Sequence, residues 1–397
     1  MAIVRKKKFK IEDTIALPRN KPKADAKSIQ ERYFSRFKEL ESMEVPFWLS
    51  TGNLMLDCAI SGGKGIPCGH HVMIRGEEGC GKSKRAIQIG AVAQQMGGLV
   101  VGQDVERRWK TSLCKLVNFN NDENSGQFKL LHPATLEEAL YNASDLFNDI
   151  LSIPAHPNEP PIVLITDSIA ALPTSRVILK RIKKGGKIME TTEPMSAPAV
   201  LSEWLRQPEV RGVKYRNVFS VWTNQLRDVV DFGVRNYGPK KLHDPGGRAL
   251  RHNISIRIDL TKSSIKEELT AEQQKYIHPD FPIGEKINYK ITKNTVGPPN
   301  RTAWEAWFFH QGEDEMLSLF NWLVDNDFIQ KKSHGSQGMY YVLWGTEYDK
   351  PEWMNLLYSD ANFRNNFRQY FIQSYNCLSL YQNNPEFGDN EEGDEFQ

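Results

Sequence analysis

The segment 76–83, Gly-Glu-Glu-Gly-Cys-Gly-Lys-Ser, has the residue types and the spacing of a phosphate-binding loop. It fits the pattern GxxxxGK[ST] at every fixed position and lies between an apolar run at 72–75 and a helical pattern that starts at Lys82. Glycines let backbone N–H groups turn toward phosphate oxygens, and the helix N-terminus adds positive potential. We therefore predict a nucleotide site; the alternative is a chance glycine-rich turn. The residues concerned are Gly76, Glu77, Glu78, Gly79, Cys80, Gly81, Lys82 and Ser83.

Two oxygen-bearing side chains are expected to hold a magnesium ion beside this loop. The Ser83 hydroxyl is one ligand, while the preceding Lys82 is expected to reach the β- and γ-phosphates. Asp167 ends the apolar run 161–166, and a carboxylate at the C-terminal end of a parallel strand points into the crevice where ligands bind. The predicted cofactors are thus ATP and Mg²⁺. Taken alone, an aspartate after an apolar run is also a common helix cap or turn residue.

The group that activates water is predicted to be Glu106, in the run Asp104-Val-Glu106. This run follows the apolar segment 99–102, which we expect to lie beside the phosphate-bearing strand. Hydrolysis needs a carboxylate that orients or deprotonates water, and Asp104 is the rival for that role. The other interpretation of Glu106 is a solvated carboxylate paired with Arg107 or Arg108.

Two long segments follow strands of the same predicted sheet. Asn224 and Gln225 end the apolar run 218–223, and an amide there can bond a γ-phosphate and transmit its presence. The segment 227–248 comes next, and the segment 176–199 follows Asp167; neither contains a predicted strand. Loops longer than about 12–15 residues inside a compact domain are usually functional or disordered. Residues 176–187 also hold six basic side chains and no acid.

These two segments are predicted to bind a nucleic-acid backbone, with apolar side chains that stack on bases or wedge between them. For any single basic residue, the alternative is a solvated surface charge. The first segment contributes Arg176, Lys180, Arg181, Lys183, Lys184, Lys187 and Met195. The second contributes Arg227, Phe232, Arg235, Tyr237, Lys240, Lys241, Gly246, Gly247 and Arg248.

Short apolar runs that alternate with helical segments must position these residues. Strands are predicted at 72–75, 99–102, 162–166, 218–223 and 254–260, and helices at 82–96 and 136–151. Near-continuous apolar strands separated by helices indicate an α/β fold, with a mainly parallel sheet covered on both faces. The segments 285–293 and 303–310 alternate polar with apolar residues and are predicted to extend the sheet in antiparallel fashion.

Four regions are predicted along the chain. Residues 1–48 form a basic arm with an amphipathic helix at 26–42 that can dock on a neighbouring protomer, and residues 49–312 form the α/β core. Residues 313–382 form a small α+β domain, with helices at 316–326 and 361–373 and a hairpin at 328–332 and 340–344. Residues 383–397, with six acids and no Lys or Arg, are expected to be disordered.

Composition excludes several classes of protein. The 397 residues carry a net charge of only +2, but residues 1–40 hold 12 basic and five acidic side chains. That asymmetry indicates a polyanionic partner or self-association, or simply two solvated termini. No apolar run reaches the roughly 18 residues of a membrane span, and residues 1–8 lack the core of a secretory signal. Five cysteines without a CxxC pair argue against a disulfide framework and suit a cytoplasmic protein.

An ordered set of motifs resembles the core of the RecA recombinase family. The set starts with the run 49–57, the run 65–69 and the phosphate loop. It continues with Asp104-Val-Glu106, the runs 166–172, 224–227 and 246–251, then 257–259 and 292–294. The resemblance covers about 49–309, and the small C-terminal domain with its acidic tail most resembles the bacteriophage UvsX-type branch.

The resemblance implies roles for individual residues. Glu106 would be the catalytic glutamate and Gln225 the γ-phosphate sensor, while Met195 would intercalate in DNA. Arg251 and Lys293 would be cations that reach the ATP of a neighbouring protomer. Two positions depart from the family pattern. A second lysine expected after Lys293-Asn294 is Thr295, and the aromatic that stacks on adenine has only poor matches in Trp109 and Leu113.

The resulting hypothesis is an ATP-dependent recombinase that forms helical filaments on single-stranded DNA and exchanges strands with homologous duplex DNA. A loading mediator and a single-strand-binding protein are further expected partners, and no membrane is. One alternative is a ring helicase on the same core, which leaves the matches at 50–52 and 246–250 unexplained. The other is a non-exchanging accessory paralogue, whose mark would be a lost Lys82 or Glu106.

Overall fold

The structure is a computed structural model that describes residues 45–156, 158–183, 196–228, 242–243, 251, 253–265, 282–335 and 338–382. The predicted arm helix, the acidic tail and much of both predicted DNA-binding segments lie outside these residues. So do the site residues Lys184, Lys187, Met195, Phe232, Arg235, Tyr237, Lys240, Lys241, Gly246, Gly247 and Arg248.

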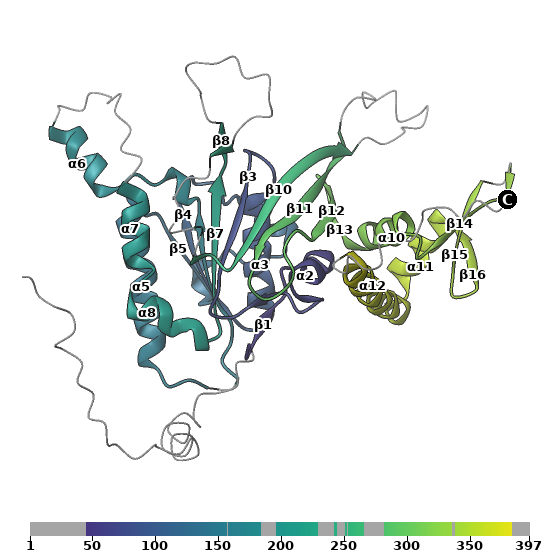
Figure 1. Cartoon of the computed structure of the whole chain (residues 1–397), viewed down its shortest axis with the longest axis horizontal. Coiled ribbons are helices and arrows are strands. Elements are labelled where there is room, and N and C mark those ends of the chain that lie inside the picture. Colours follow the sequence, from purple (N-terminus) through teal and green to yellow (C-terminus); the bar gives the residue numbers. More distant parts are fainter. Residues whose placement is uncertain are drawn as a thin grey trace, which may run out of the picture. The chain divides into compact units, whose positions relative to one another are not determined.

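A nine-stranded mixed sheet in the order β13-β12-β11-β10-β3-β7-β6-β4-β5 organises the molecule (Figure 1). Six neighbouring strands are parallel: β10 (Ile256–Ile265), β3 (His71–Gly76), β7 (Val218–Gln225), β6 (Ile162–Asp167), β4 (Leu99–Asp104) and β5 (Phe128–Leu131). The antiparallel extension consists of β11 (Gly284–Asn294), β12 (Thr302–Phe308) and β13 (Gly312–Asp314). The predicted α/β class and the antiparallel extension are therefore confirmed.

The position of β4 differs from the prediction. β4 pairs with β5 and β6, so that two strands, β6 and β7, separate it from β3. After β3 the chain passes through helix α3 (Lys82–Gln95) and skips the two positions that later strands fill. Local sequence patterns predict strands but not their spatial order, because that order depends on contacts between distant segments.

Each face of the sheet has its own hydrophobic cluster. In β6, Val163 and Ile165 belong to the cluster beneath α3, whereas Leu164 belongs to the opposite one. Helices α5 (Leu136–Ser152), α7 (Ser196–Trp204) and α8 (Pro208–Gly212) cover this second face (Figure 1). This alternation buries a parallel strand on both sides, as expected for a sheet covered by helices on both faces.

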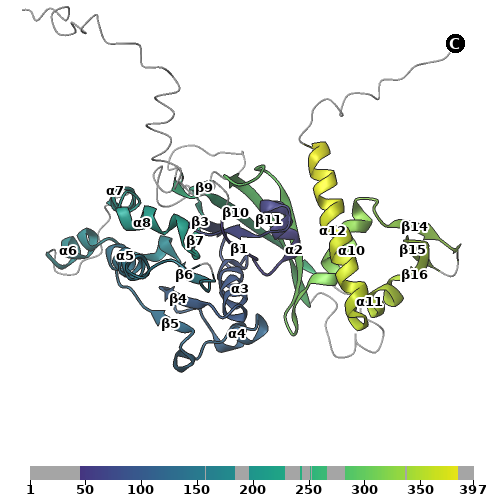
Figure 2. The same cartoon turned by 90° about the horizontal axis from the view of Figure 1, so that it is seen from below.

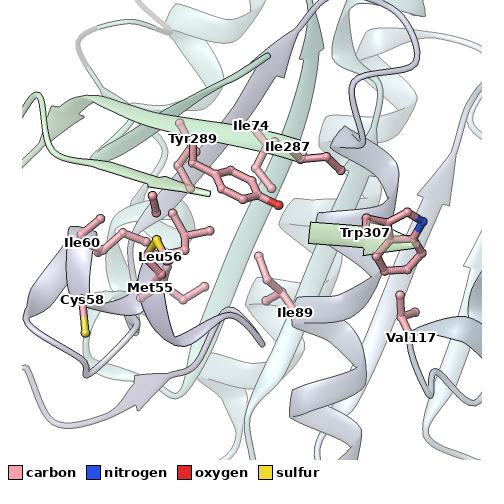
Figure 3. Packing of buried hydrophobic residues seen from close by; sticks show 14 of the residues in the cluster. Met55, Leu56, Cys58, Ile60, Ile74, Ile89, Val117, Ile287, Tyr289 and Trp307 are labelled. Atoms are coloured by element: carbon pink, nitrogen blue, oxygen red, sulfur yellow. The ribbon is translucent and has the colours of Figure 1, made fainter. Parts of the chain in front are cut away.

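The larger cluster also holds α2 (Leu54–Ser61) against the sheet. Figure 3 shows Met55 and Leu56 of α2, Ile89 of α3 and Ile287 of β11 in one packed layer. The two-stranded pair β1 (Trp48–Leu49) and β2 (Ile66–Pro67) encloses α2 in sequence. This packing places the start of α3, and with it the phosphate loop, next to β10 and β11.

The interpretation of 176–199 as an irregular loop is wrong for its described parts. Residues Ser175–Lys183 form helix α6, and α7 begins at Ser196. In the second segment, β8 (Arg227–Asp228) pairs with β9 (Leu242–His243), so its base contains a short antiparallel ladder where no strand was predicted. Helix α4 (Thr111–Leu116) and strand β5 were not predicted either.

The C-terminal elements follow directly on the last strand of the sheet. They comprise α10 (Glu315–Asp325), the three-stranded sheet β14 (Gln330–Ser333), β15 (Met339–Leu343) and β16 (Thr346–Asp349), α11 (Lys350–Ser359) and α12 (Ala361–Gln382) (Figure 2). The predicted hairpin is present, and β16 and α11 are additions to it. Buried residues of α10, α11 and α12 belong to the same hydrophobic cluster as α2 and α3. No helix in the described ranges is long and apolar enough to cross a membrane.

Three successive acids connect the sheet to neighbouring helices: Glu313 and Asp314 end β13, and Glu315 begins α10. Glu313 accepts hydrogen bonds from residues before and within α3, as described below. Asp314 caps α10 through the N–H of Leu317 (3.0 Å) and accepts a hydrogen bond from the Tyr358 hydroxyl of α11 (2.5 Å). Glu315 pairs with Arg368 of α12. Each acid thus binds a different element.

Candidate nucleotide-binding site

The phosphate loop has the backbone conformation that its glycines permit. Gly79 and Gly81 have φ values of 71° and 94°, in the left-handed region that favours glycine. A Cβ on Gly76 would lie 2.6 Å from the carbonyl oxygen of Leu260, so only glycine fits there. Gly81 is the N-cap of α3 and has no side chain to accept from the first-turn N–H groups. Those N–H groups are the donors that a phosphate uses at a helix N-terminus.

A cavity of about 390 Å³ brings the predicted catalytic groups together at the C-terminal edge of the parallel strands. Four of them come from four different places in the sequence: the phosphate loop, the end of β4, the end of β6 and the end of β7. The predicted residues that line it are Gly79, Gly81, Lys82, Ser83, Glu106, Asp167 and Gln225. Lys84, Arg108, Lys110, Leu113 and Ser168 complete the lining.

Lys82 is held by the loop that it belongs to. Its Nζ donates hydrogen bonds to the carbonyl oxygens of Gly76 (3.0 Å) and Glu77 (2.6 Å), and its side chain is buried. The Gly76 oxygen also accepts a hydrogen bond from the N–H of Leu226 (3.1 Å), directly after Gln225. The ammonium group therefore sits at the base of the loop, beside the end of β7.

Asp167 is the most enclosed carboxylate of the cavity, at 3% exposure. Burial raises its pKa, and hydrogen bonds from the Ser83 and Thr223 hydroxyls oppose that rise. The Thr223 hydroxyl donates at 2.5 Å, and the Trp109 indole N–H donates to the other carboxylate oxygen at 3.3 Å. The two predicted magnesium ligands, Ser83 and Asp167, are thus hydrogen-bonded neighbours. No cluster of three or more His, Cys, Asp or Glu suited to a metal occurs among the described residues.

Glu106 and Asp104, the two candidates for the general base, have different contacts. Asp104 is buried and accepts the backbone N–H groups of Arg108 and Trp109, both at 3.0 Å, so it shapes the loop after β4. Glu106 lines the cavity, with a side chain 19% exposed. It accepts a hydrogen bond from Ser168 Oγ (2.7 Å) and pairs with Arg108 Nε (2.7 Å). The pair with Arg108 that the alternative interpretation named is therefore present, but Glu106 lies inside the cavity and is largely buried rather than solvated.

The two poor matches for an adenine-stacking aromatic are placed differently. Trp109 stacks on Phe128 at 5.8 Å between ring centroids and meets Phe119 edge to face. It packs against Gly102, where an added Cβ would approach the indole to 2.7 Å. Its structural role is to support Asp167 from the side of the core. Leu113 of α4 lines the cavity next to Lys110.

Arg251 and Lys293 lie together, away from these groups. Lys293 Nζ donates a hydrogen bond to the Arg251 carbonyl oxygen (2.9 Å), and burial together with the nearby Arg257 charge lowers the pKa of Lys293. Neither residue lines the cavity of its own chain. Among the predicted DNA-binding residues, Arg176, Lys180, Arg181 and Lys183 lie on α6, and Arg227 begins β8.

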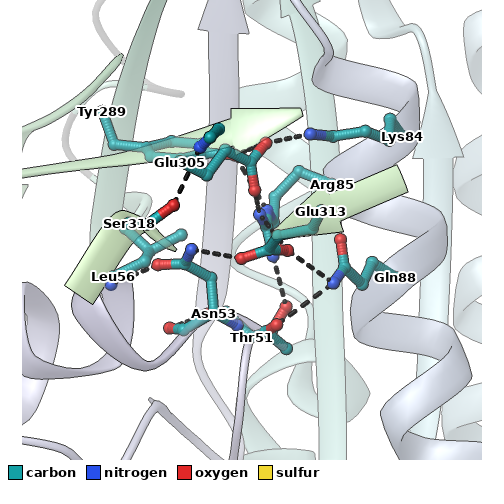
Figure 4. Close-up of polar contacts among 12 residues, drawn as sticks. Thr51, Asn53, Leu56, Lys84, Arg85, Gln88, Tyr289, Glu305, Glu313 and Ser318 are labelled. Carbon is teal, nitrogen blue, oxygen red and sulfur yellow. Dashed lines mark hydrogen bonds and ion pairs between the residues drawn. The ribbon is translucent and has the colours of Figure 1, made fainter. Parts of the chain in front are cut away.

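A buried charged network, which the sequence did not indicate, anchors α3 on its other side (Figure 4). Glu305 of β12 pairs with both Lys84 and Arg85, and all three side chains are at most 6% exposed. Arg85 also pairs with Glu313 (3.2 Å), which accepts from Gln88 (2.9 Å) as well. These contacts connect the first turns of α3 to β12 and β13. A weak signal was available, because polar side chains occupy inward positions of otherwise apolar strands.

A third acid in this region is Asp57 of α2. It accepts hydrogen bonds from the Ser50 hydroxyl (2.5 Å) and from the N–H (2.8 Å) and hydroxyl (2.6 Å) of Thr51. Burial raises the pKa of Asp57 to about 6 despite these bonds. Thr51 in turn offers its carbonyl oxygen to Arg85 (3.1 Å), so Asp57 is part of the same polar layer.

Comparisons with known proteins identify the family of this chain. The RecA N-terminal domain family matches residues 36–314. The RecA protein of Rhodopirellula baltica is 32% identical over 256 residues, which cover 64% of this chain and 58% of the relative. That of Streptococcus agalactiae is 29% identical over 283 residues, covering 71% and 66%. That of Thermus thermophilus is 28% identical over 312 residues, covering 79% and 81%.

The phosphate loop at the C-terminal edge of this sheet defines an α/β protein with a RecA-like core. The family match extends over well more than half of the chain, from the residues before β1 to the end of β13. The chain belongs to the RecA family. It spans less than two thirds of the length of the Rhodopirellula and Streptococcus relatives.

Proposed function

We propose that this protein is an ATP-dependent DNA recombinase, which assembles on single-stranded DNA as a helical filament and exchanges strands with homologous duplex DNA. The observation that carries the proposal is the single cavity that gathers Lys82, Ser83, Glu106, Asp167 and Gln225. Membership of the RecA family supports the choice of DNA as the partner. We assign accessory roles in the recombinase to the small C-terminal unit at 313–382 and to the basic arm at 1–48.

The cavity suits a magnesium nucleotide. Ser83 and Asp167 offer hydroxyl and carboxylate oxygens, and Mg²⁺ in phosphate sites typically takes one or two such protein ligands. Bound there, the ion would neutralise charge between the β- and γ-phosphates. Lys82 would exchange its two carbonyl contacts for phosphate oxygens.

The hydrolytic roles follow from position in the cavity. Glu106 would orient and deprotonate water, because it lines the cavity, whereas Asp104 does not line it and accepts two backbone N–H groups of its own loop. Gln225 would bond the γ-phosphate. Since Leu226 N–H already bonds Gly76 at the phosphate loop, movement at Gln225 would pass directly into β8 and the segment beyond it.

Electron microscopy with ATP and single-stranded DNA tests the assembly, and a homologous pairing assay tests the activity. We expect helical filaments and joint molecules from the wild type, and no joint molecules from Lys82→Ala. Rings with duplex unwinding would favour a helicase. DNA binding without ATP turnover would favour an accessory paralogue.

The neighbouring protomer is proposed to complete the site through Arg251 and Lys293. Mixing Lys293→Ala with Lys82→Ala protein should restore part of the ATPase activity, at junctions where an intact Lys82 meets an intact Lys293. Absence of complementation between folded, co-assembling proteins would contradict a shared site.

The basic residues at 176–187 are proposed to contact DNA phosphates. Changing Lys183, Lys184 and Lys187 to Ala should flatten the slope of log affinity against log salt by about 0.7 per lost contact. ATP binding without DNA should stay the same. Lys129→Ala removes another lysine, one paired on the surface with Glu123, and serves as the matched control. An unchanged slope would assign the three lysines to the solvated surface.

A further inference from the structure

One arginine in the cavity connects the proposed general base to the phosphate loop. Arg108 pairs through Nε with Glu106 Oε2 (2.7 Å) and through Nη2 with Glu78 Oε1 (2.8 Å). Glu78 belongs to the phosphate loop, whereas Glu106 follows β4, so the guanidinium bridges segments 28 residues apart in sequence. Both pairs use the rigid fork that distinguishes Arg from Lys.

The backbone fixes where this arginine points. The N–H groups of Arg108 and Trp109 both bond to the buried Asp104, and Arg107 before them adopts a left-handed φ of 53°. Trp109 is then packed against Phe128 in the core. The loop is therefore held from both sides, and the Arg108 side chain is directed into the cavity that it lines.

Both carboxylate oxygens of Glu106 are held in this arrangement. Ser168 donates to one oxygen and Arg108 to the other. A general base must present an oxygen to the water that it deprotonates, at hydrogen-bond distance. A carboxylate has about four acceptor positions, so the two contacts set the orientation of Glu106 without filling it, and release of one contact lets the side chain turn toward the water. Of the two contacts, the ion pair with Arg108 is released more easily. The arginine side chain is 46% exposed, and exposed pairs contribute only about 0–1 kcal/mol.

We propose that Arg108 is a positioning residue that restrains Glu106 in a resting orientation and ties that orientation to the phosphate loop through Glu78. Turnover is faster when the guanidinium leaves Glu106, because the carboxylate can then turn toward the water. This inference rests on the proposed ATPase function. It predicts that Arg108 limits turnover when DNA is absent, rather than supplying charge to the reaction.

The test measures kcat and KM for ATP without DNA, together with the Kd of a non-hydrolysable ATP analogue. Arg108→Ala should raise kcat about two- to fivefold, which is the range that an exposed pair can supply. It should weaken analogue binding, because Glu78 and Glu106 lose their counter-ion near the phosphates. Glu78→Gln should also raise kcat, but it should tighten analogue binding because it removes a negative charge. The two variants should therefore shift kcat in the same direction and the Kd of the analogue in opposite directions. A general structural disturbance would not produce that combination.

Three further variants isolate the mechanism. Arg108→Lys keeps the charge without the fork and should give an intermediate kcat. Arg107→Ala removes the neighbouring positive charge and should leave kcat and Kd unchanged. In a Glu106→Gln background, Arg108→Ala should no longer raise the residual kcat, because it acts through Glu106.

An unchanged or lower kcat in Arg108→Ala, or an equal rise in the Glu106→Gln background, would overturn the proposal. The failure of the proposed function looks different: wild-type protein would then show no hydrolysis that depends on Lys82.

Discussion

Helix α3 begins between two charged networks that differ chiefly in exposure. On the cavity side, Glu78, Arg108 and Glu106 form a chain in which the arginine is 46% and Glu78 67% exposed. On the other side, Arg85 and Glu305 are fully buried and connect α3 to the edge of the sheet. Water competes for the first network and is excluded from the second. The same ion-pair chemistry thus leaves one side of the phosphate loop adjustable and the other fixed.

The largest expected effect is on the exposed side and concerns rate. Glu106→Gln keeps the size of the side chain and a hydrogen-bonding oxygen but removes the base, so hydrolysis should fall by about 10²–10⁴-fold. ATP binding and the free energy of unfolding should change little, which equilibrium binding and urea titration would check. Wild-type hydrolysis in this variant would shift the assignment to Asp104.

The next effect is on the buried side and concerns stability. Glu305→Ala leaves Lys84 and Arg85 without their shared buried partner, so the free energy of unfolding should fall by about 3–5 kcal/mol in a urea titration. Lys332→Ala, which breaks an exposed pair with Glu347, is the control and should cost less than about 1 kcal/mol. Equal losses of unfolding free energy in Glu305→Ala and Lys332→Ala would show that the buried pairs stabilise the fold no more than an exposed pair does.

The buried side should also respond to pH through Asp57. Its pKa in the folded protein, about 6, lies above the ordinary value of 3.8 for an aspartate, so the folded state binds the proton more tightly. This stabilising contribution is complete below about pH 3.8 and is lost as pH rises through about 6, by about 3 kcal/mol in total. The difference in unfolding free energy between wild type and Asp57→Asn should show this change between pH 4 and 7. A constant difference over that range would contradict the raised pKa.

The smallest effect returns to the exposed side. Glu78→Gln breaks the pair between the phosphate loop and Arg108, and the free energy of unfolding should change by less than about 1 kcal/mol. Thermal unfolding without nucleotide would measure it. A loss comparable to that of Glu305→Ala would mean that the cavity-side network is structural.

Much of this arrangement could be predicted from local patterns. The phosphate loop and the runs that end at Asp167 and Gln225 are contiguous in sequence, and the rule that ligands bind at the C-terminal ends of parallel strands brings them to one edge. The order of the strands could not be predicted in this way. Two strands that come later in the chain lie between β3 and β4, so the neighbour of the phosphate-bearing strand is β7.

The missed features have other causes. Lys84 and Arg85 look like ordinary surface residues of a helix, because their partner Glu305 lies about 220 positions further along the chain. The segment that contains α6 is predicted as a loop because it lacks a strand pattern, although Val177, Ile178 and Ile182 have helical spacing.

The three successive acids at 313–315, where β13 passes into α10, limit how this chain can change in length. Glu313 bonds Arg85 and Gln88 of α3, Asp314 bonds Tyr358 of α11, and Glu315 pairs with Arg368 of α12. A single inserted or deleted residue here would turn at least one acid away from its partner, since successive strand residues point to opposite faces and successive helix residues are rotated by about 100°. Insertions and fusions would therefore be tolerated better at the turn between β15 and β16, where Trp344 is half exposed and Gly345 has open space around its Cα, than at this joint.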